Sequence, residues 1–127
     1  MTRFPGLTAA EHRLKMCNEW SEKQLQDKIV QLAEELGWMT FHIYDSRRSN
    51  PGWPDLVLVH PVRRRLIIWE LKSKNGRATP AQLTWLTALR NLGLNVGIKK
   101  PEDWASESIQ RELAARADST IEGKPSA

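Results

Sequence analysis

The chain has 127 residues, a formal net charge of +4 at pH 7 and one cysteine, Cys17. This length fits one domain, the lone cysteine excludes an internal disulfide and an all-cysteine zinc site, and no apolar run approaches the ~20 residues of a membrane helix. The N-terminus lacks the apolar core of a signal peptide, so we expect a cytoplasmic protein, and the positive charge makes nucleic acid the first partner to consider.

The N-terminal part of the chain predicts helix. Residues 9–16 could form a short helix, although the first twenty residues show no clear pattern. The first clear element is a helix over 21–36, where Ser21 and Gln24 have the spacing of a capping box and Gly37 supplies a C-terminal stop.

Three strands are predicted next. Residues 38–44 are rich in aromatic and β-branched side chains, which favours a strand, and a polar loop over 45–54 follows. The runs DLVLVH at 55–60 and RLIIWELK at 65–72 flank a short turn. Two apolar runs so closely joined predict an antiparallel hairpin.

The C-terminal part predicts a helix, a strand and a last helix. A capping-box pattern with a proline at the first helical position opens a helix over 79–92, and residues 95–99 form a short strand. A last helix is predicted over 106–117, before a small polar tail. The order α-β-β-β-α-β-α predicts an α/β fold with a mixed central sheet flanked by helices.

Charged residues interrupt the hairpin where burial would normally exclude them. Glu70 and Lys72 face the same side of their strand, and the hairpin brings Asp55 beside Glu70. Two carboxylates brought together repel each other unless a cation lies between them, and oxygen ligands suit Mg²⁺ or Mn²⁺. Such an ion can polarise a phosphate oxygen and lower the pKa of a bound water molecule, and Lys72 can neutralise charge that develops on the phosphate. The arrangement therefore predicts phosphodiester hydrolysis.

A lone Glu-x-Lys most often forms an ordinary ion pair at a strand end, so the prediction depends on the ordered set of motifs. Pro54-Asp55 followed by Glu70-Leu71-Lys72 resembles the PD-(D/E)XK nuclease superfamily. Within it the chain is most similar to the virus-type replication-repair nuclease (VRR-NUC) family, over about residues 21–113. The motifs that carry this resemblance are Ser21-Glu22, GWPDLVLV at 52–59, WELK at 69–72, Thr79-Pro80-Ala81-Gln82 and Pro101-Glu102-Asp103.

The resemblance implies a restriction-endonuclease-like α-β-β-β-α-β core and a structure-specific endonuclease. Its expected substrate is branched DNA, such as a Holliday junction or a flap, in phage or bacterial replication and repair, and its expected cofactor is Mg²⁺ or Mn²⁺. The predicted catalytic residues are Asp55, Glu70, Lys72 and Gln82, and the predicted metal ligands are Glu22, Asp55, Glu70 and Leu71. From the residues alone, Glu22 could simply favour the helix dipole, and Gln82 could simply complete its capping box.

Contacts with DNA are predicted from polar and basic residues near these motifs. Any single basic cluster could also be an ordinary solvent-exposed turn or strand end that binds no DNA. Trp53 could pack on its own loop as readily as stack on a base. His42 could reach the site, but nothing places it at a metal-ligand spacing. The predicted DNA-binding residues are Arg47, Arg48, Ser49, Trp53, Lys74 and Arg77.

Two other functions remain open, and a homodimer is predicted. A non-catalytic nucleic-acid-binding module on a nuclease-like fold has no need of converging carboxylates, and a sequence-specific restriction enzyme would need a further recognition domain. The interface candidates are the N-terminal segment around Leu14, Met16 and Trp20, or the last helix around Ile109 and Leu113. The predicted organisation is an extension over 1–20, a nuclease domain over 21–117 and a flexible tail over 118–127.

Overall fold

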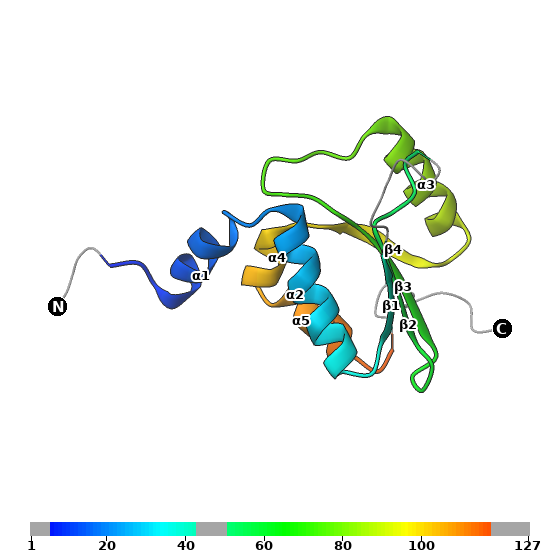
Figure 1. Cartoon of the computed structure of the whole chain (residues 1–127), viewed down its shortest axis with the longest axis horizontal. Coiled ribbons are helices and arrows are strands. Elements are labelled where there is room, and N and C mark those ends of the chain that lie inside the picture. The colour runs from blue at the N-terminus through cyan, green and yellow to red at the C-terminus, as the bar shows by residue number, and fades with distance from the viewer. Residues whose placement is uncertain (1–5, 43–50, 118–127) are drawn as a thin grey trace.

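The computed structural model describes residues 6–42 and 51–117 of the chain. These residues form helices and strands in the predicted order, with two short helices at the C-terminal end (Figure 1). The elements are α1 Ala9–Cys17, α2 Glu22–Glu35, β1 Met39–His42, β2 Leu56–His60, β3 Arg65–Leu71, α3 Pro80–Asn91, β4 Asn95–Lys99, α4 Pro101–Ala105 and α5 Ser108–Ala114.

The strands form one mixed sheet in the order β1-β2-β3-β4. β1, β2 and β3 pair antiparallel, whereas β3 and β4 pair parallel. In the β2–β3 hairpin, Leu56 lies opposite Trp69, so the start of β2 lies beside the end of β3. The predicted α/β class, mixed sheet and hairpin are therefore confirmed.

The helices α2 and α3 begin where capping boxes predict. Ser21 Oγ accepts a hydrogen bond from Gln24 N at 3.1 Å, and Gln24 Oε1 accepts one from Ser21 N at 2.8 Å. Thr79 and Gln82 make the same reciprocal pair at the start of α3. Each box satisfies backbone donors that the first turn of a helix leaves without partners.

The predicted last helix over 106–117 is observed as the shorter α5, and the sequence prediction missed the short helix α4 before it. Glu107, between α4 and α5, has a φ of 68°. A left-handed residue cannot continue a right-handed helix, so the chain turns there. The predicted strand over 38–44 is observed as β1 up to His42, and its last two residues lie outside the described residues.

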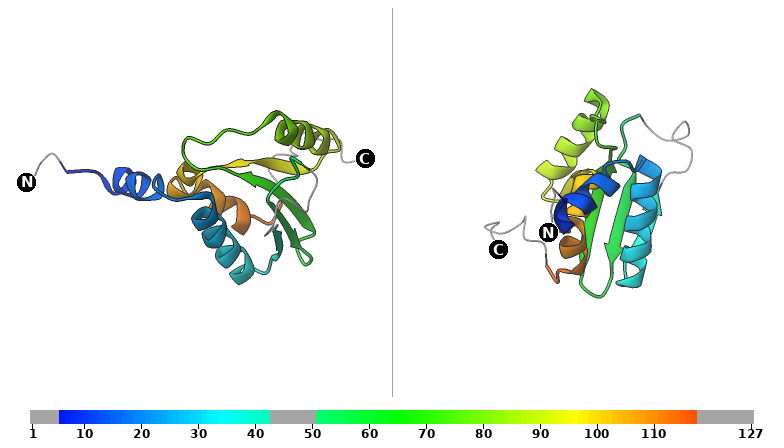
Figure 2. Two further views of the ribbon diagram at one scale, coloured as in Figure 1. Left: turned by 45° about the horizontal axis from the view of Figure 1, so that its top comes forward. Right: turned by 90° about the vertical axis from the view of Figure 1, so that its left-hand side faces the viewer.

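The main core lies on one face of the sheet, under α2 and α5. Figure 2 shows these helices on one side of the sheet and α3 on the other. Because strand side chains alternate, Trp69 and Leu71 enter the core whereas Glu70 faces α3. The buried core residues are Leu25, Ile29, Ala33, Trp38, Leu56, Leu58, Ile67, Trp69, Leu71, Ile109 and Leu113.

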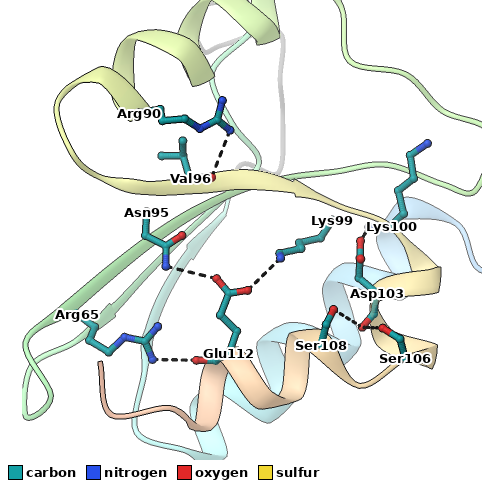
Figure 3. Close-up of polar contacts among 10 residues, drawn as sticks. All are labelled: Arg65, Arg90, Asn95, Val96, Lys99, Lys100, Asp103, Ser106, Ser108 and Glu112. Carbon is teal, nitrogen blue, oxygen red and sulfur yellow. Dashed lines mark hydrogen bonds and ion pairs between the residues drawn. The ribbon is translucent and has the colours of Figure 1, made fainter. Parts of the chain in front are cut away.

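A polar network ties α5 to the sheet (Figure 3). Glu112 accepts hydrogen bonds from Lys99 Nζ at 3.0 Å and Asn95 Nδ2 at 3.4 Å, and its backbone oxygen accepts one from an Arg65 guanidinium nitrogen at 2.8 Å. Arg63 donates to the backbone oxygens of the last turn of α5. Arg63 of the β2–β3 turn and Arg65 at the start of β3 therefore satisfy carbonyls at the end of the helix, which is a structural role.

The predicted N-terminal helix is observed as α1, which packs beside α4 (Figure 1). Arg13 Nε donates to the backbone oxygen of Ala105 at 3.4 Å, and Cys17 is buried. No helix among residues 6–42 and 51–117 has the length and apolar character that crossing a membrane requires.

Candidate active site

The candidate site begins at the C-terminal end of β3, where Glu70 and Lys72 are both buried. Lys72 N donates to the backbone oxygen of Lys99 at 3.0 Å, so pairing with β4 continues one residue beyond β3. Lys72 Nζ lies 3.3 Å from Glu70 Oε2, and only 1% of Glu70 is exposed. The sheet thus holds an ammonium group against a carboxylate that solvent does not reach.

Gln82 joins this pair from α3. Its Oε1 accepts from Thr79 N in the capping box, which turns the amide nitrogen towards the sheet. Nε2 then donates to Glu70 Oε2 at 2.8 Å. The capping role and the site contact predicted for Gln82 are compatible, because the two ends of one amide serve them separately.

Asp55 reaches the same end of β3 from the other strand of the hairpin. Its Oδ2 accepts a hydrogen bond from Leu71 N at 2.9 Å, which fixes the carboxylate just ahead of β2. This contact follows from the hairpin register, in which the residue before Leu56 lies across from Glu70. Asp55 is half-buried, so one side of the carboxylate stays open to solvent.

Glu70 is electrostatically strained. Burial, and then the nearby Asp55 carboxylate, raise its pKa to about 8, while Lys72 acts in the opposite direction. Glu70 Oε1 is buried and has no hydrogen-bond partner among the described residues. Such an oxygen is costly to bury, and a cation beside it would relieve both the missing partner and the repulsion.

A cleft of about 930 Å³ opens beside Asp55 and Leu71 and runs along α2. Glu22, the exposed first residue of α2, lines this cleft, as does His42, whose Nδ1 lies 3.4 Å from Gln26 Nε2. Within residues 6–42 and 51–117, no three His, Cys, Asp or Glu side chains stand together as a ready metal cage. Glu22 therefore shares the cleft without joining Asp55 and Glu70 in a compact cluster.

The donors at the end of β3 nevertheless fit a divalent cation. Asp55 and Glu70 supply carboxylate oxygens, and the buried Glu70 Oε1 is available to a ligand. The main chain of Leu71 lies between them, and Glu22 could complete the set from the cleft. An all-oxygen set of this kind suits Mg²⁺ or Mn²⁺.

The loop before Asp55 is clamped onto α3, a feature that the sequence prediction missed. A Cβ on Gly52, whose φ is +87°, would lie 2.6 Å from the carbonyl of Ala81. Trp53 packs edge-on against Trp85 with ring centroids 5.0 Å apart, and Trp85 Nε1 donates to the backbone oxygen of Pro51 at 3.1 Å. The packing alternative for Trp53 is thus the observed one, although its ring remains half-exposed.

The other predicted DNA-binding residues fall in two groups. Arg47, Arg48 and Ser49 lie outside the described residues. Lys74 and Arg77 are exposed on the segment between β3 and α3, and both line a second hollow together with Lys100. The sequence prediction did not assign Lys100 to DNA, although it follows β4 directly.

Comparisons with known proteins agree with this geometry. The VRR-NUC domain family model matches residues 8–100, from the cap of α1 to the end of β4. A solved structure described as a VRR_NUC domain has a TM-score of 0.58 and 27% identity, and the match covers 70% of this chain and 94% of that one.

A second solved structure, a VRR_NUC domain protein, has a TM-score of 0.53 over 78% of this chain and 92% of that one, and at 18% identity it supports the fold alone. No protein of curated function matches the chain. Because the family model covers most of its length, this chain belongs to the VRR-NUC domain family, a family of nucleases.

Proposed function

We propose that the protein is a Mg²⁺- or Mn²⁺-dependent, structure-specific endonuclease that hydrolyses phosphodiester bonds in branched DNA. The proposal rests on the environment of Glu70, a buried carboxylate that contacts Lys72 and Gln82 and has one oxygen without a partner among the described residues. Burial and the nearby Asp55 raise the pKa of this carboxylate. Membership of a nuclease family supports the reaction class.

Each proposed residue has a separate task. Asp55, Glu70 and the main chain of Leu71 would hold the cation, with Glu22 assisting from the cleft. The bound ion would polarise the phosphate and lower the pKa of a water molecule. Lys72 would neutralise negative charge that develops on the phosphate, and Gln82 would keep Glu70 oriented through its hydrogen bond.

The alternative function is a nucleic-acid-binding module without catalysis. A binding surface gains nothing from a buried carboxylate whose pKa is raised to about 8, since this arrangement destabilises the fold at neutral pH. Basic residues alone would suffice for a binder. The burial of Glu70 therefore favours the nuclease.

The proposed preference for branched DNA is tested with a panel of labelled DNAs. Four-way junctions, flaps, linear duplexes and single strands would be incubated with Mg²⁺, with Mn²⁺ and with a chelator. We expect metal-dependent cleavage that is fastest on a branched DNA. Binding of these DNAs with no cleavage in either metal would favour the binding module, whereas equal cleavage of linear and branched DNA would contradict the structural preference.

We also propose a homodimer, which would place two sites on the opposed strands of a junction. Ile109 and Leu113 of the last helix are fully buried in the core, so they are not available for a dimer interface. Trp20 packs near Trp104 at a centroid distance of 6.0 Å, which leaves Leu14 and Met16 of α1, 40% and 58% exposed. Light scattering of wild-type protein and of Met16→Glu should give dimer and monomer masses; a wild-type monomer on junction DNA would refute the dimer.

The remaining proposals concern place and organisation. We propose that the protein acts on DNA in the cytoplasm of a bacterium or a phage-infected cell, in replication or repair. We also propose a nuclease domain over 21–117, with α1 as part of an N-terminal extension that packs on it. Arg47, Arg48 and Ser49 would contact DNA phosphates ahead of Asp55.

A further inference from the structure

A second hollow, of about 600 Å³, lies beside the candidate site on the α3 side of the sheet. We call it the basic hollow; it is lined by residues 74–78 together with Leu83, Ile98 and Lys100. Ile98 is the β4 residue paired with Glu70, so the hollow begins one strand away from Glu70. Neighbouring strands are about 4.8 Å apart, which makes the hollow and the site direct neighbours.

No acidic residue in the described part of the lining neutralises the charge of the basic hollow. Of the described residues that line it, three are cationic and none is acidic. Among residues 6–42 and 51–117, Lys100 Nζ donates only to the backbone oxygen of Lys74, at 3.4 Å, and this contact leaves its positive charge in place. Figure 3 shows Lys99 pointing towards Glu112 and Lys100 pointing away from that network. Lys99 is thereby paired within the fold, whereas Lys100 turns its charge to the hollow.

Apolar groups give the basic hollow a second character. Leu83 is 48% exposed and Ile98 36% exposed, and both line the hollow beside the cations. A nucleotide offers matching chemistry, because its sugar is largely apolar and its phosphate is anionic. Phosphate contacts from lysine and arginine position a protein on DNA without reading its sequence.

We propose that the basic hollow binds the sugar-phosphate backbone of the cut DNA strand, at a nucleotide that flanks the scissile phosphate. The proposal rests on the proposed function, because it places the DNA that the site would cut. Lys74, Arg77 and Lys100 hold phosphate oxygens, while Leu83 and Ile98 lie under the sugar. The strand then passes from the hollow towards Glu70 at the end of β3.

The test removes two charges from the hollow and compares the result with a matched loss elsewhere. The test variant is Arg77→Gln with Lys100→Gln. The control is Lys15→Gln with Arg64→Gln, which removes two exposed cations from α1 and from the β2–β3 turn. Thermal unfolding of all proteins confirms that each variant is folded.

Cleavage kinetics and DNA binding are then measured over a series of salt concentrations. In the test variant, we expect KM to rise about tenfold or more. We also expect the slope of the logarithm of the DNA-binding constant against the logarithm of the salt concentration to flatten by about 1.8, since each of the two lost phosphate contacts accounts for about 0.9. The value of kcat should stay within about twofold, because these residues position DNA without touching the reacting atoms. The single variant Lys74→Glu should raise KM in the same way.

Three outcomes are distinguishable. A KM and salt slope equal to those of the control variant would overturn the basic hollow while leaving the nuclease intact. A fall in kcat with unchanged KM would also overturn it, because the residues would then act on chemistry. Wild-type protein that neither binds nor cuts DNA would refute the proposed function, and with it this inference.

Discussion

Two hollows lie on opposite sides of the end of β3, and their charges are opposite. The cleft along α2 is acidic: the carboxylates of Glu22, Asp27, Glu34, Glu35 and Asp55 line it, with Lys23 as a basic member. The basic hollow on the α3 side has three cations and no acidic residue among its described lining. The acidic side suits a cation and the basic side suits a DNA strand, so the two ligands of a nuclease have separate approaches.

Strand alternation produces this separation. Leu71 lines the acidic cleft, whereas its neighbour Glu70 faces α3 and pairs across the sheet with Ile98 of the basic hollow. Asp55 lies just ahead of β2, and its Oδ2 accepts a hydrogen bond from Leu71 N. The hairpin register thus connects both hollows to a single pair of carboxylates.

The largest expected effect comes from Asp55 and Lys72 at the end of β3. Asp55→Asn and Lys72→Ala should each lower the single-turnover cleavage rate about a thousandfold or more, since each removes charge that acts on the reacting phosphate. Both proteins should still bind DNA through the basic hollow. A folded variant of either kind that cuts at the wild-type rate would contradict the site.

A smaller effect is expected on the acidic side. Glu22→Gln should lower cleavage by about tenfold, because Glu22 lines the cleft but lies outside the closer pair of carboxylates. Extra Mn²⁺ should recover part of the loss, since the defect is weaker metal binding. Glu35→Gln in the same cleft is the matched control; equal losses in both variants would mean that the cleft acts only through its overall charge.

The pH dependence of stability should identify Glu70 as the strained group. Between the ordinary glutamate pKa of 4.5 and the folded-state pKa of about 8, the folded state keeps a proton that the unfolded state releases. The free energy of unfolding of metal-free protein should therefore fall as pH rises through this window, by an amount of the order of a few kcal/mol.

Glu70→Gln carries no such proton. Measured by denaturant unfolding from about pH 5 to about pH 9, this variant should gain stability relative to wild type as pH rises. A constant difference between the two proteins across that range would show that Glu70 ionises normally in the fold.

A further expected effect concerns the clamp that holds the loop before Asp55. Gly52→Ala should lower the free energy of unfolding by about 2 kcal/mol and reduce cleavage, because its Cβ would meet the Ala81 carbonyl and its φ is positive. Gly6→Ala is the control, since no described atom lies within 4 Å of the position that its Cβ would take. Equal stability of the two variants would show that the loop is free to move.

Local signals predict much of this fold. The capping boxes at Ser21 and Thr79 place the starts of α2 and α3, and β4 spans the predicted residues 95–99. The hairpin pattern also predicts that Asp55 approaches Glu70, because register follows from a short turn. These features depend on residues close together in sequence, which is why pattern alone identifies them.

Long-range contacts account for what the sequence analysis misses. The turn at Glu107 has no proline or glycine to mark it, and the arginines of the β2–β3 turn bond α5 about fifty residues away in sequence. The contact of Trp85 with Trp53 likewise joins two segments that no local pattern relates, although Trp85 lies one helical turn after Gln82. Lys100 becomes a candidate for DNA binding only when β4 is placed beside Glu70.

Cleavage of supercoiled plasmid by wild-type protein and Glu70→Gln tests the central claim most directly. With Mg²⁺ or Mn²⁺, wild-type protein should nick the plasmid, a chelator should stop the reaction, and Glu70→Gln should leave the DNA intact while still binding it. Nicking by wild-type protein in excess chelator, or equal nicking by Glu70→Gln in Mg²⁺, would contradict a metal-dependent site built on the carboxylates at the end of β3.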